Sequence, residues 1–173
     1  SNLYLMRHLI DRHRLSTRVW VGFHLYKDNL DDAAKMRALC AELGFDYREN
    51  PAVLHPVEKV IEVIEGRAKP ADEAIAAQLL THPVAIRDQV RARRSGHYDC
   101  ELRFNMTTIN HDGTVALCCA TYGPETQLGV HFLDESHAQL EARKYAHPFC
   151  ATCYRHGLQY TAAKLPPPKL SPA

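Results

Sequence analysis

Hydrophobic residues recur at two spacings along the first part of the chain, and these spacings predict alternating helices and strands. Residues 1–14 carry leucines and an isoleucine at helical spacing, which predicts a helix with an apolar face. The mostly apolar run at 18–25 (RVWVGFHL) predicts a buried strand. A second helix follows, with Asn29 or Asp28 as its N-cap and Gly44 as its C-terminal stop.

A short strand is expected next, at 45–48. Strand, helix and strand joined by short connections are typical of a parallel βα arrangement, but two such strands cannot close a barrel. Helical spacing then predicts three more helices, over 56–66, 70–80 and 83–94.

The predicted helix at 83–94 has an arginine-rich face. Its arginines are Arg87, Arg91, Arg93 and Arg94. An ordinary solvated helix surface accounts for such a face. The alternative is a docking patch for an acidic partner.

The pattern changes after Gly96. Apolar residues alternate over 102–109, which predicts a strand, and 110–113 (NHDG) has the chemistry of a turn. A partner strand at 114–118 completes a β-hairpin. One further short helix is expected over 135–146.

Composition narrows the class of protein. The chain has 173 residues, of which 46% are hydrophobic and 24% charged, which suits a soluble globular protein of one or two domains. A net charge of +1 argues against a nucleic-acid partner. No apolar run approaches a membrane span and no signal peptide is visible, so we expect no membrane association and a cytoplasmic location. The proline-rich residues 164–173 predict a tail.

Cysteines carry the clearest chemical signal. Cys150 and Cys153 form a C-x2-C pair, and a pair from elsewhere in the chain would complete four thiolates suited to zinc or to an iron–sulfur cluster. Cys100 is one candidate. Cys118 and its neighbour Cys119 would face opposite sides of a strand, so only one of them should reach the metal. The sixth cysteine, Cys40, lies among apolar helix residues and is expected to be a buried small hydrophobic residue.

The order Cys100, Gly113, Cys118, Cys150 and Cys153 resembles the SPASM and Twitch domains that follow the barrel of many radical S-adenosylmethionine enzymes. The matching words are HDGTVALC (111–118), LGV (128–130) and HPFCATC (147–153).

The resemblance implies a small α+β domain over 97–163, with a β-hairpin and a short helix. It selects Cys118, which stands in the G-x4-C position, over Cys119. No cysteine follows Cys153, so the shorter Twitch form is implied, with one auxiliary [4Fe–4S] cluster on Cys100, Cys118, Cys150 and Cys153. Four thiolates close the cluster to substrate, so the implied role is electron transfer. Arg155 and His156 would tune its potential or be ordinary loop residues.

Residues 1–55 resemble the last strands and helices of the barrel in such enzymes, notably at VGFHLYKDN (21–29). The implied fold class is therefore α/β, with a partial parallel βα barrel end over 1–96 before the Twitch-like domain. Functional side chains of barrels project from the carboxyl ends of strands, which makes His24, Tyr26 and Lys27 substrate-cavity candidates. Packing or a solvated loop is the other interpretation of each.

The catalytic C-x3-C-x2-C motif of radical S-adenosylmethionine enzymes does not occur in these residues. We therefore expect a C-terminal portion of a longer enzyme, or else a relative that has lost the chemistry. A barrel portion would be the missing partner and would hold S-adenosylmethionine and the second [4Fe–4S] cluster. An acidic electron-donor protein is a further expected partner. Two alternatives stay open: a structural zinc module and a small electron carrier.

Overall fold

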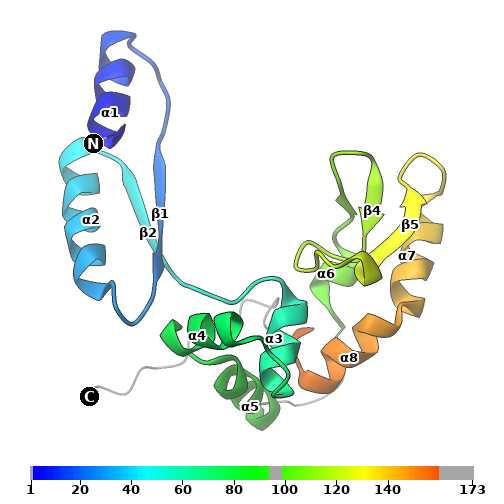
Figure 1. Cartoon of the computed structure of the whole chain (residues 1–173). Helices are drawn as coiled ribbons and strands as arrows, with labels where there is room; N and C mark the ends of the chain where they lie inside the picture. Colours follow the sequence, from blue (N-terminus) through cyan, green and yellow to red (C-terminus); the bar gives the residue numbers. More distant parts are fainter. Residues whose placement is uncertain (1, 94–98, 160–173) are drawn as a thin grey trace. The chain divides into compact units, whose positions relative to one another are not determined.

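The structure is a computed structural model that describes residues 2–93 and 99–159, and these residues form a mixed α/β protein without a barrel (Figure 1). The chain divides into two compact units. Of the described residues, those up to 53 and those at 74–80 form unit 1, and all others form unit 2. Residues 54–73 and 81–93 thus group with the second half of the chain, although the sequence placed them before a boundary at 96. The predicted tail at 164–173 lies outside the described residues.

Unit 1 contains the expected parallel βα arrangement. Its elements are α1 (Asn2–Arg12), β1 (Trp20–Leu25), α2 (Leu30–Leu43), β2 (Asp46–Pro51) and the second half of α4 (Pro70–Gln78). Strands β1 and β2 pair in parallel, from Trp20 opposite Asp46 to Leu25 opposite Pro51. The core consists of Ile10, Cys40, Leu43 and Phe45. Cys40 is fully buried there, which confirms its predicted role as a small hydrophobic residue.

Helix α2 begins after Asn29 and ends at Gly44, as predicted. Gly44 ends it in the left-handed conformation, at φ +66°, and its amide bonds the carbonyls of the last turn. Asn29 takes the N-cap position without making a side-chain cap hydrogen bond. Its side chain instead accepts from the Tyr26 amide at 2.8 Å and donates to the His24 carbonyl at 2.9 Å, so it closes the turn after β1.

The prediction that β1 is buried is wrong. Its residues alternate between exposed and half-buried, and Trp20 is 55% exposed with the Arg48 guanidinium 4.0 Å from its ring centroid. The apolar side chains Leu5, Met6 and Leu9 of α1 are exposed as well. Val21 of β1 and Tyr47 of β2 pack against the core of unit 1, while the alternate residues of β1 face the other side of the sheet and are exposed.

Unit 2 contains helices around a small antiparallel sheet. Its helices are α3 (Val57–Ile64), the first part of α4, α5 (Pro83–Arg93), α6 (Glu101–Phe104), η1 (Pro124–Thr126), α7 (His137–Ala146) and α8 (Pro148–His156). Its strands are β3 (Thr108–Ile109), β4 (Thr114–Ala116) and β5 (Gln127–His131), in that order across the sheet. The hairpin of β3 and β4 and helix α7 confirm two predictions, and a capping box of Ser136 and Gln139 fixes the start of α7.

The strand predicted over 102–109 is largely a helical turn. Only Thr108–Ile109 is strand, and Glu101–Phe104 is α6. The amide of Arg103 donates to the Cys100 carbonyl at 2.8 Å, and the Arg103 side chain pairs with Asp99 one turn earlier. These local contacts override the alternating pattern.

Two further observations complete the fold. Helix α5 contains Arg87, Arg91 and Arg93 of the predicted arginine face, and Arg94 lies outside the described residues. Arg87 forms an ion pair with Asp88 at 2.8 Å. No helix among the described residues has the length and apolar character that crossing a bilayer requires.

Candidate metal centre

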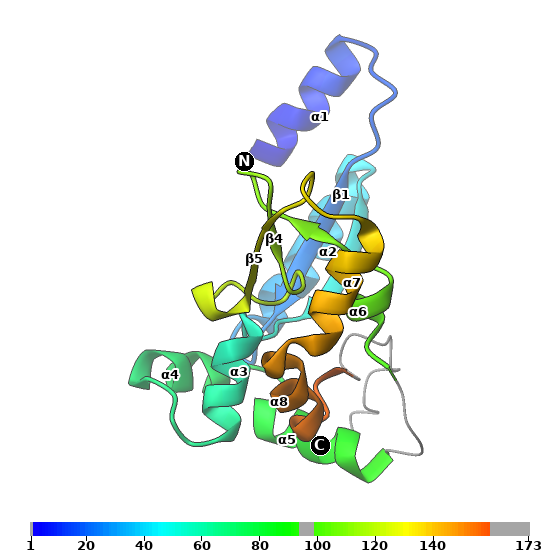
Figure 2. The ribbon, with the colours of Figure 1, turned by 90° about the vertical axis from the view of Figure 1, so that its right-hand side faces the viewer.

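All four predicted metal ligands belong to unit 2. Cys100 is the N-cap residue of α6, Cys118 follows β4, and Cys150 and Cys153 lie on α8. Each of the four is half-buried and none forms a disulfide. Both views of the ribbon show α7 leading directly into α8, which lies below the sheet of unit 2 (Figures 1 and 2).

The C-x2-C pair lies within helix α8, which the sequence analysis did not predict. His147 caps α8, since its Nδ1 accepts the Phe149 amide at 3.2 Å, and Pro148 occupies the first helical position. Gly157 ends the helix at φ +75°. A spacing of three residues places Cys150 and Cys153 on the same helix face.

The four thiols act on one another electrostatically. Burial raises the pKa of Cys153 to about 12, and the thiols of Cys100, Cys150 and Cys118 act in the same direction. Burial also raises the pKa of Cys150 to about 11, where Arg103 opposes it and Cys118 and Cys100 add to it. Four cysteines from three separate stretches of chain therefore share one electrostatic neighbourhood.

The side chains do not form a ready site for a single ion. A tetrahedral zinc site needs sulfur atoms about 2.3 Å from one point. Across residues 2–93 and 99–159, no group of three or more His, Cys, Asp or Glu side chains is arranged to hold a metal ion. The four cysteines thus supply the donor atoms that zinc and iron–sulfur clusters use, but their side chains are not arranged around one metal ion.

Cys118 and Cys119 differ in their surroundings. Cys118 is half-buried, with its Sγ 3.8 Å from the Thr121 hydroxyl, while Cys119 is exposed. Cys118 also acts on the pKa of both Cys150 and Cys153. These features favour Cys118, although the choice of ligand stays a prediction.

The start of α3 holds the loop that follows Cys118. The Val57 amide donates to the Ala120 carbonyl at 2.8 Å. The Glu58 carboxylate accepts the Tyr122 and Gly123 amides, both at 2.9 Å, and the Thr126 hydroxyl at 3.1 Å. One carboxylate oxygen therefore satisfies three donors and fixes the course of the loop.

The end of α3 holds α8. Ile61 and Ile64 pack against Leu158, with Cys153 and Phe149 at the margin of this cluster.

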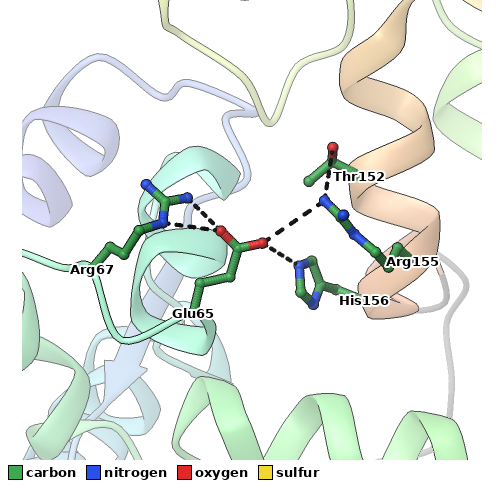
Figure 3. A network of polar contacts seen from close by, with 5 residues as sticks. All are labelled: Glu65, Arg67, Thr152, Arg155 and His156. Carbon is green, nitrogen blue, oxygen red and sulfur yellow. Dashed lines mark hydrogen bonds and ion pairs between the residues drawn. The ribbon is translucent and has the colours of Figure 1, made fainter.

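A polar network lies beside this apolar contact (Figure 3). Glu65 lies 2.9 Å from His156 Nε2 and 3.9 Å from an Arg155 nitrogen, and it also accepts from Arg67. Arg155 in turn donates to Thr152 at 3.3 Å. One helix thus anchors both the Cys118 loop and the helix of Cys150 and Cys153.

Cys100 is tied to α8 by a second network. Its amide donates to the Tyr154 hydroxyl and to Asp99, both at 2.7 Å. Asp99 also accepts from Tyr154, Tyr145 and Arg103, and these bonds, with that of the Cys100 amide, lower its pKa to about 2 although burial acts to raise it. The Arg103 guanidinium stacks 3.9 Å from the Tyr145 ring centroid and 4.9 Å from that of Tyr154.

Two cationic side chains act to lower the pKa of a candidate ligand, and the sequence analysis identified neither of them. They are Arg103 and Lys144, which both act to lower the pKa of Cys150. His156, which was considered for such tuning, pairs with Glu65. Arg103 carried a weak signal in its spacing of four from Asp99 and three from Cys100. Lys144 carried none, because nothing in the sequence marks one lysine of a charged helix as buried.

The substrate-cavity candidates lie in unit 1, at the carboxyl end of β1 as predicted. His24 is exposed, and Tyr26 forms an isolated bridge with Leu79. Lys27 donates from its Nζ to the Ala77 carbonyl at 2.7 Å and from its amide to Gln78 at 3.0 Å, so it binds the last turn of α4. A role for the three in a substrate cavity stays a prediction.

Comparison with protein-family models, with curated proteins and with solved structures finds no match to this chain.

Proposed function

We propose that unit 2 binds one auxiliary [4Fe–4S] cluster through Cys100, Cys118, Cys150 and Cys153, in the C-terminal portion of a radical S-adenosylmethionine enzyme. The observation that supports this proposal is the way contacts tie the cysteine-bearing segments together: the Cys100 amide bonds the Tyr154 hydroxyl on α8 at 2.7 Å, and α3 holds both α8 and the loop after Cys118. A cluster of this kind, when bound, supplies one-electron chemistry.

The protein's own residues have separate roles in this proposal. The four thiolates hold the group and leave no iron open to substrate. The contacts of α3 with the Cys118 loop and with α8 fix two of the three ligand-bearing segments, and Tyr154 fixes the third. Arg103 and Lys144 offset negative charge at the sulfurs. The arrangement suits electron transfer during oxidation or modification of a substrate that is bound elsewhere.

Unit 1 would belong to the barrel of the same enzyme. Within the described part of the chain, β1 and β2 pair only with each other along their length, so each has an edge that a further parallel strand could join. The remaining strands, S-adenosylmethionine and the second cluster would come from a barrel portion that these residues do not include.

The ligand assignment is tested by paired cysteine variants, reconstituted with iron and sulfide in the absence of oxygen. Cys118→Ala should lose iron, sulfide and the absorbance of the cluster. Cys119→Ala removes the same atoms from the neighbouring residue and should keep the iron, the sulfide and the absorbance. Equal loading of the two variants and the wild type would contradict the assignment.

A structural zinc site on the same cysteines is the second candidate. It is favoured by the position of Cys153, which packs at the margin of the apolar cluster of Ile61, Ile64 and Leu158. A closed set of four thiolates within a core is typical of metal ions that stabilise a fold. This function would give metal-dependent folding without redox activity.

A further inference from the structure

One face of the unit 1 sheet is left open by the described residues. Val21 and Tyr47 pack against the core of unit 1. Because side chains alternate along a strand, the residues on either side of them point to the opposite face. We call this opposite face the open face, and its residues are Trp20, Gly22 and His24 of β1 and Asp46, Arg48 and Asn50 of β2. Only Asp46 among them is half-buried, and the others are exposed.

The open face is polar, which is unusual for a parallel sheet. Parallel strands occur almost only in folds that cover both faces of the sheet, and their side chains are then mostly Val, Ile and Leu. The open face instead has a histidine, an asparagine and two opposite charges, beside the only tryptophan of the chain. An apolar helix layer would bury these polar groups without partners. A polar ligand is the cover that matches their chemistry.

The register of the strands forms a floor in the middle of the open face. The six residues lie in three rows, which are Trp20 with Asp46, Gly22 with Arg48, and His24 with Asn50. A Cβ at Gly22 would meet only the Asn50 Nδ2, at 3.7 Å. Glycine within a strand often marks a bulge or a place where a ligand approaches closely. The pairing at Gly22 is regular, so the close approach of a ligand accounts for it better than a bulge does.

Arg48 is the cation that the open face offers to a ligand. Its guanidinium lies over the Trp20 ring, 4.0 Å from the ring centroid. Asp46 is already paired with Arg18, and among the described residues no carboxylate forms an ion pair with Arg48. A guanidinium held against an aromatic ring keeps its N–H donors in one orientation. Such a fixed pair of donors suits the two oxygens of a carboxylate or a phosphate.

We infer that the open face of unit 1 binds a small molecule through an oxyanion group, a carboxylate or a phosphate, that pairs with the Arg48 guanidinium. The body of the ligand lies over Gly22, and His24 and Asn50 supply hydrogen bonds in the next row. The Trp20 ring holds Arg48 in place. The inference concerns unit 1 alone, so it goes beyond the proposed cluster site and does not require it.

Binding is measured with three small probes. Benzoate and phenyl phosphate each carry an oxyanion on a flat ring, and benzamide has the shape of benzoate without its charge. Because Trp20 is the sole tryptophan, its fluorescence and its indole N–H signal in NMR spectra report on the open face alone. We expect a saturable change in both signals with at least one of the two anions and none with benzamide. The anion that binds more tightly identifies the natural group as a carboxylate or a phosphate.

Three variants locate the binding. Arg48→Gln should weaken it at least about tenfold, the effect of losing a hydrogen bond to a charged group. Arg37→Gln removes the same charge from another exposed arginine of unit 1, which pairs with Glu49, and should bind like the wild type. Gly22→Val fills the floor with a residue that suits a strand, so it should weaken binding while Arg48 stays in place. Circular dichroism shows which variants are folded.

The outcomes separate this inference from the proposed function. A wild type that gives no saturable response to either anion overturns the inference, whatever its cysteines bind. Equal binding of benzamide and benzoate does so too, because the oxyanion would then not be recognised. Equal weakening by Arg48→Gln and Arg37→Gln would assign the effect to overall charge and would also contradict it. Iron and sulfide analysis of the same samples tests the cysteine site independently, so either proposal can fail without the other.

Discussion

The amide of Cys100 donates a hydrogen bond of 2.7 Å to the hydroxyl of Tyr154. The bond joins the start of α6 to α8, the helix that carries Cys150 and Cys153, across 54 residues of sequence. It therefore sets the position of one proposed ligand relative to two others.

Removing that hydroxyl should weaken the centre. Tyr154→Phe leaves the Cys100 amide with Asp99 alone, and the loss of one such bond costs about 1 kcal/mol of unfolding free energy. We expect a lower urea midpoint and faster loss of a reconstituted cluster in air. Tyr145→Phe is the control, because Tyr145 bonds Asp99 from an exposed position without contacting the Cys100 amide. Equal cluster lifetimes in the two variants would contradict the role given to Tyr154.

Glu58 should contribute more to the free energy of unfolding than an ordinary glutamate on a helix surface. Its carboxylate accepts three hydrogen bonds from the loop after Cys118. Glu58→Ala leaves these donors without their partner, at a cost of about 2 kcal/mol or more. Glu62→Ala, one turn further along α3, is the matched substitution and should cost less. Chemical denaturation of the metal-free proteins measures both, and a similar loss from the two would argue against this anchor.

Acid should weaken the contact between α3 and α8. Hydrogen bonds from Arg67 and then from His156 lower the pKa of Glu65 below its ordinary value of 4.5, against a raising effect of burial. A lowered carboxyl pKa stabilises the fold above the unfolded value and ceases to do so as the pH falls through the folded value. The wild type should thus be more stable than Glu65→Gln at pH 6, and the difference should shrink below about pH 4.5. A difference that stays constant from pH 6 to pH 3 would refute the linkage.

Gly113 in the hairpin turn leaves little room for a side chain. Its φ is +83°, and a Cβ there would lie 1.9 Å from His131 Nε2. Gly129 has a similar φ of +69° with open space around it. Gly129→Ala should therefore cost only the backbone strain, about 1 kcal/mol, and Gly113→Ala should cost clearly more. Thermal unfolding of both variants tests this, and equal losses would show that the His131 ring gives way freely.

Local signals in the sequence predicted much of the fold. The NHDG turn with its flanking strands, the stop of α2 at Gly44 and the helix at 135–146 depend on turn and capping chemistry that acts within a few residues. Helix α8 was not predicted, although His147, Pro148 and Gly157 are start and stop signals of a helix.

The surroundings of the cysteines could not be predicted in the same way. Glu58, Lys144 and Tyr154 act through partners 38 to 68 residues away in the sequence. Such contacts follow from how α3, α7 and α8 pack, and no short-range pattern encodes them. The cysteine spacing could point to the candidate ligands, whereas the residues that position and tune them became visible only in the fold.

The central claim, one auxiliary cluster on four cysteines, is tested most directly by chemical analysis of the wild-type chain. Protein purified and reconstituted without oxygen would be assayed for iron, acid-labile sulfide and zinc, together with its optical spectrum. The claim predicts about four irons and four sulfides per chain with a cluster spectrum. One tightly bound zinc without sulfide, even after reconstitution, would contradict it and establish the structural metal site in its place.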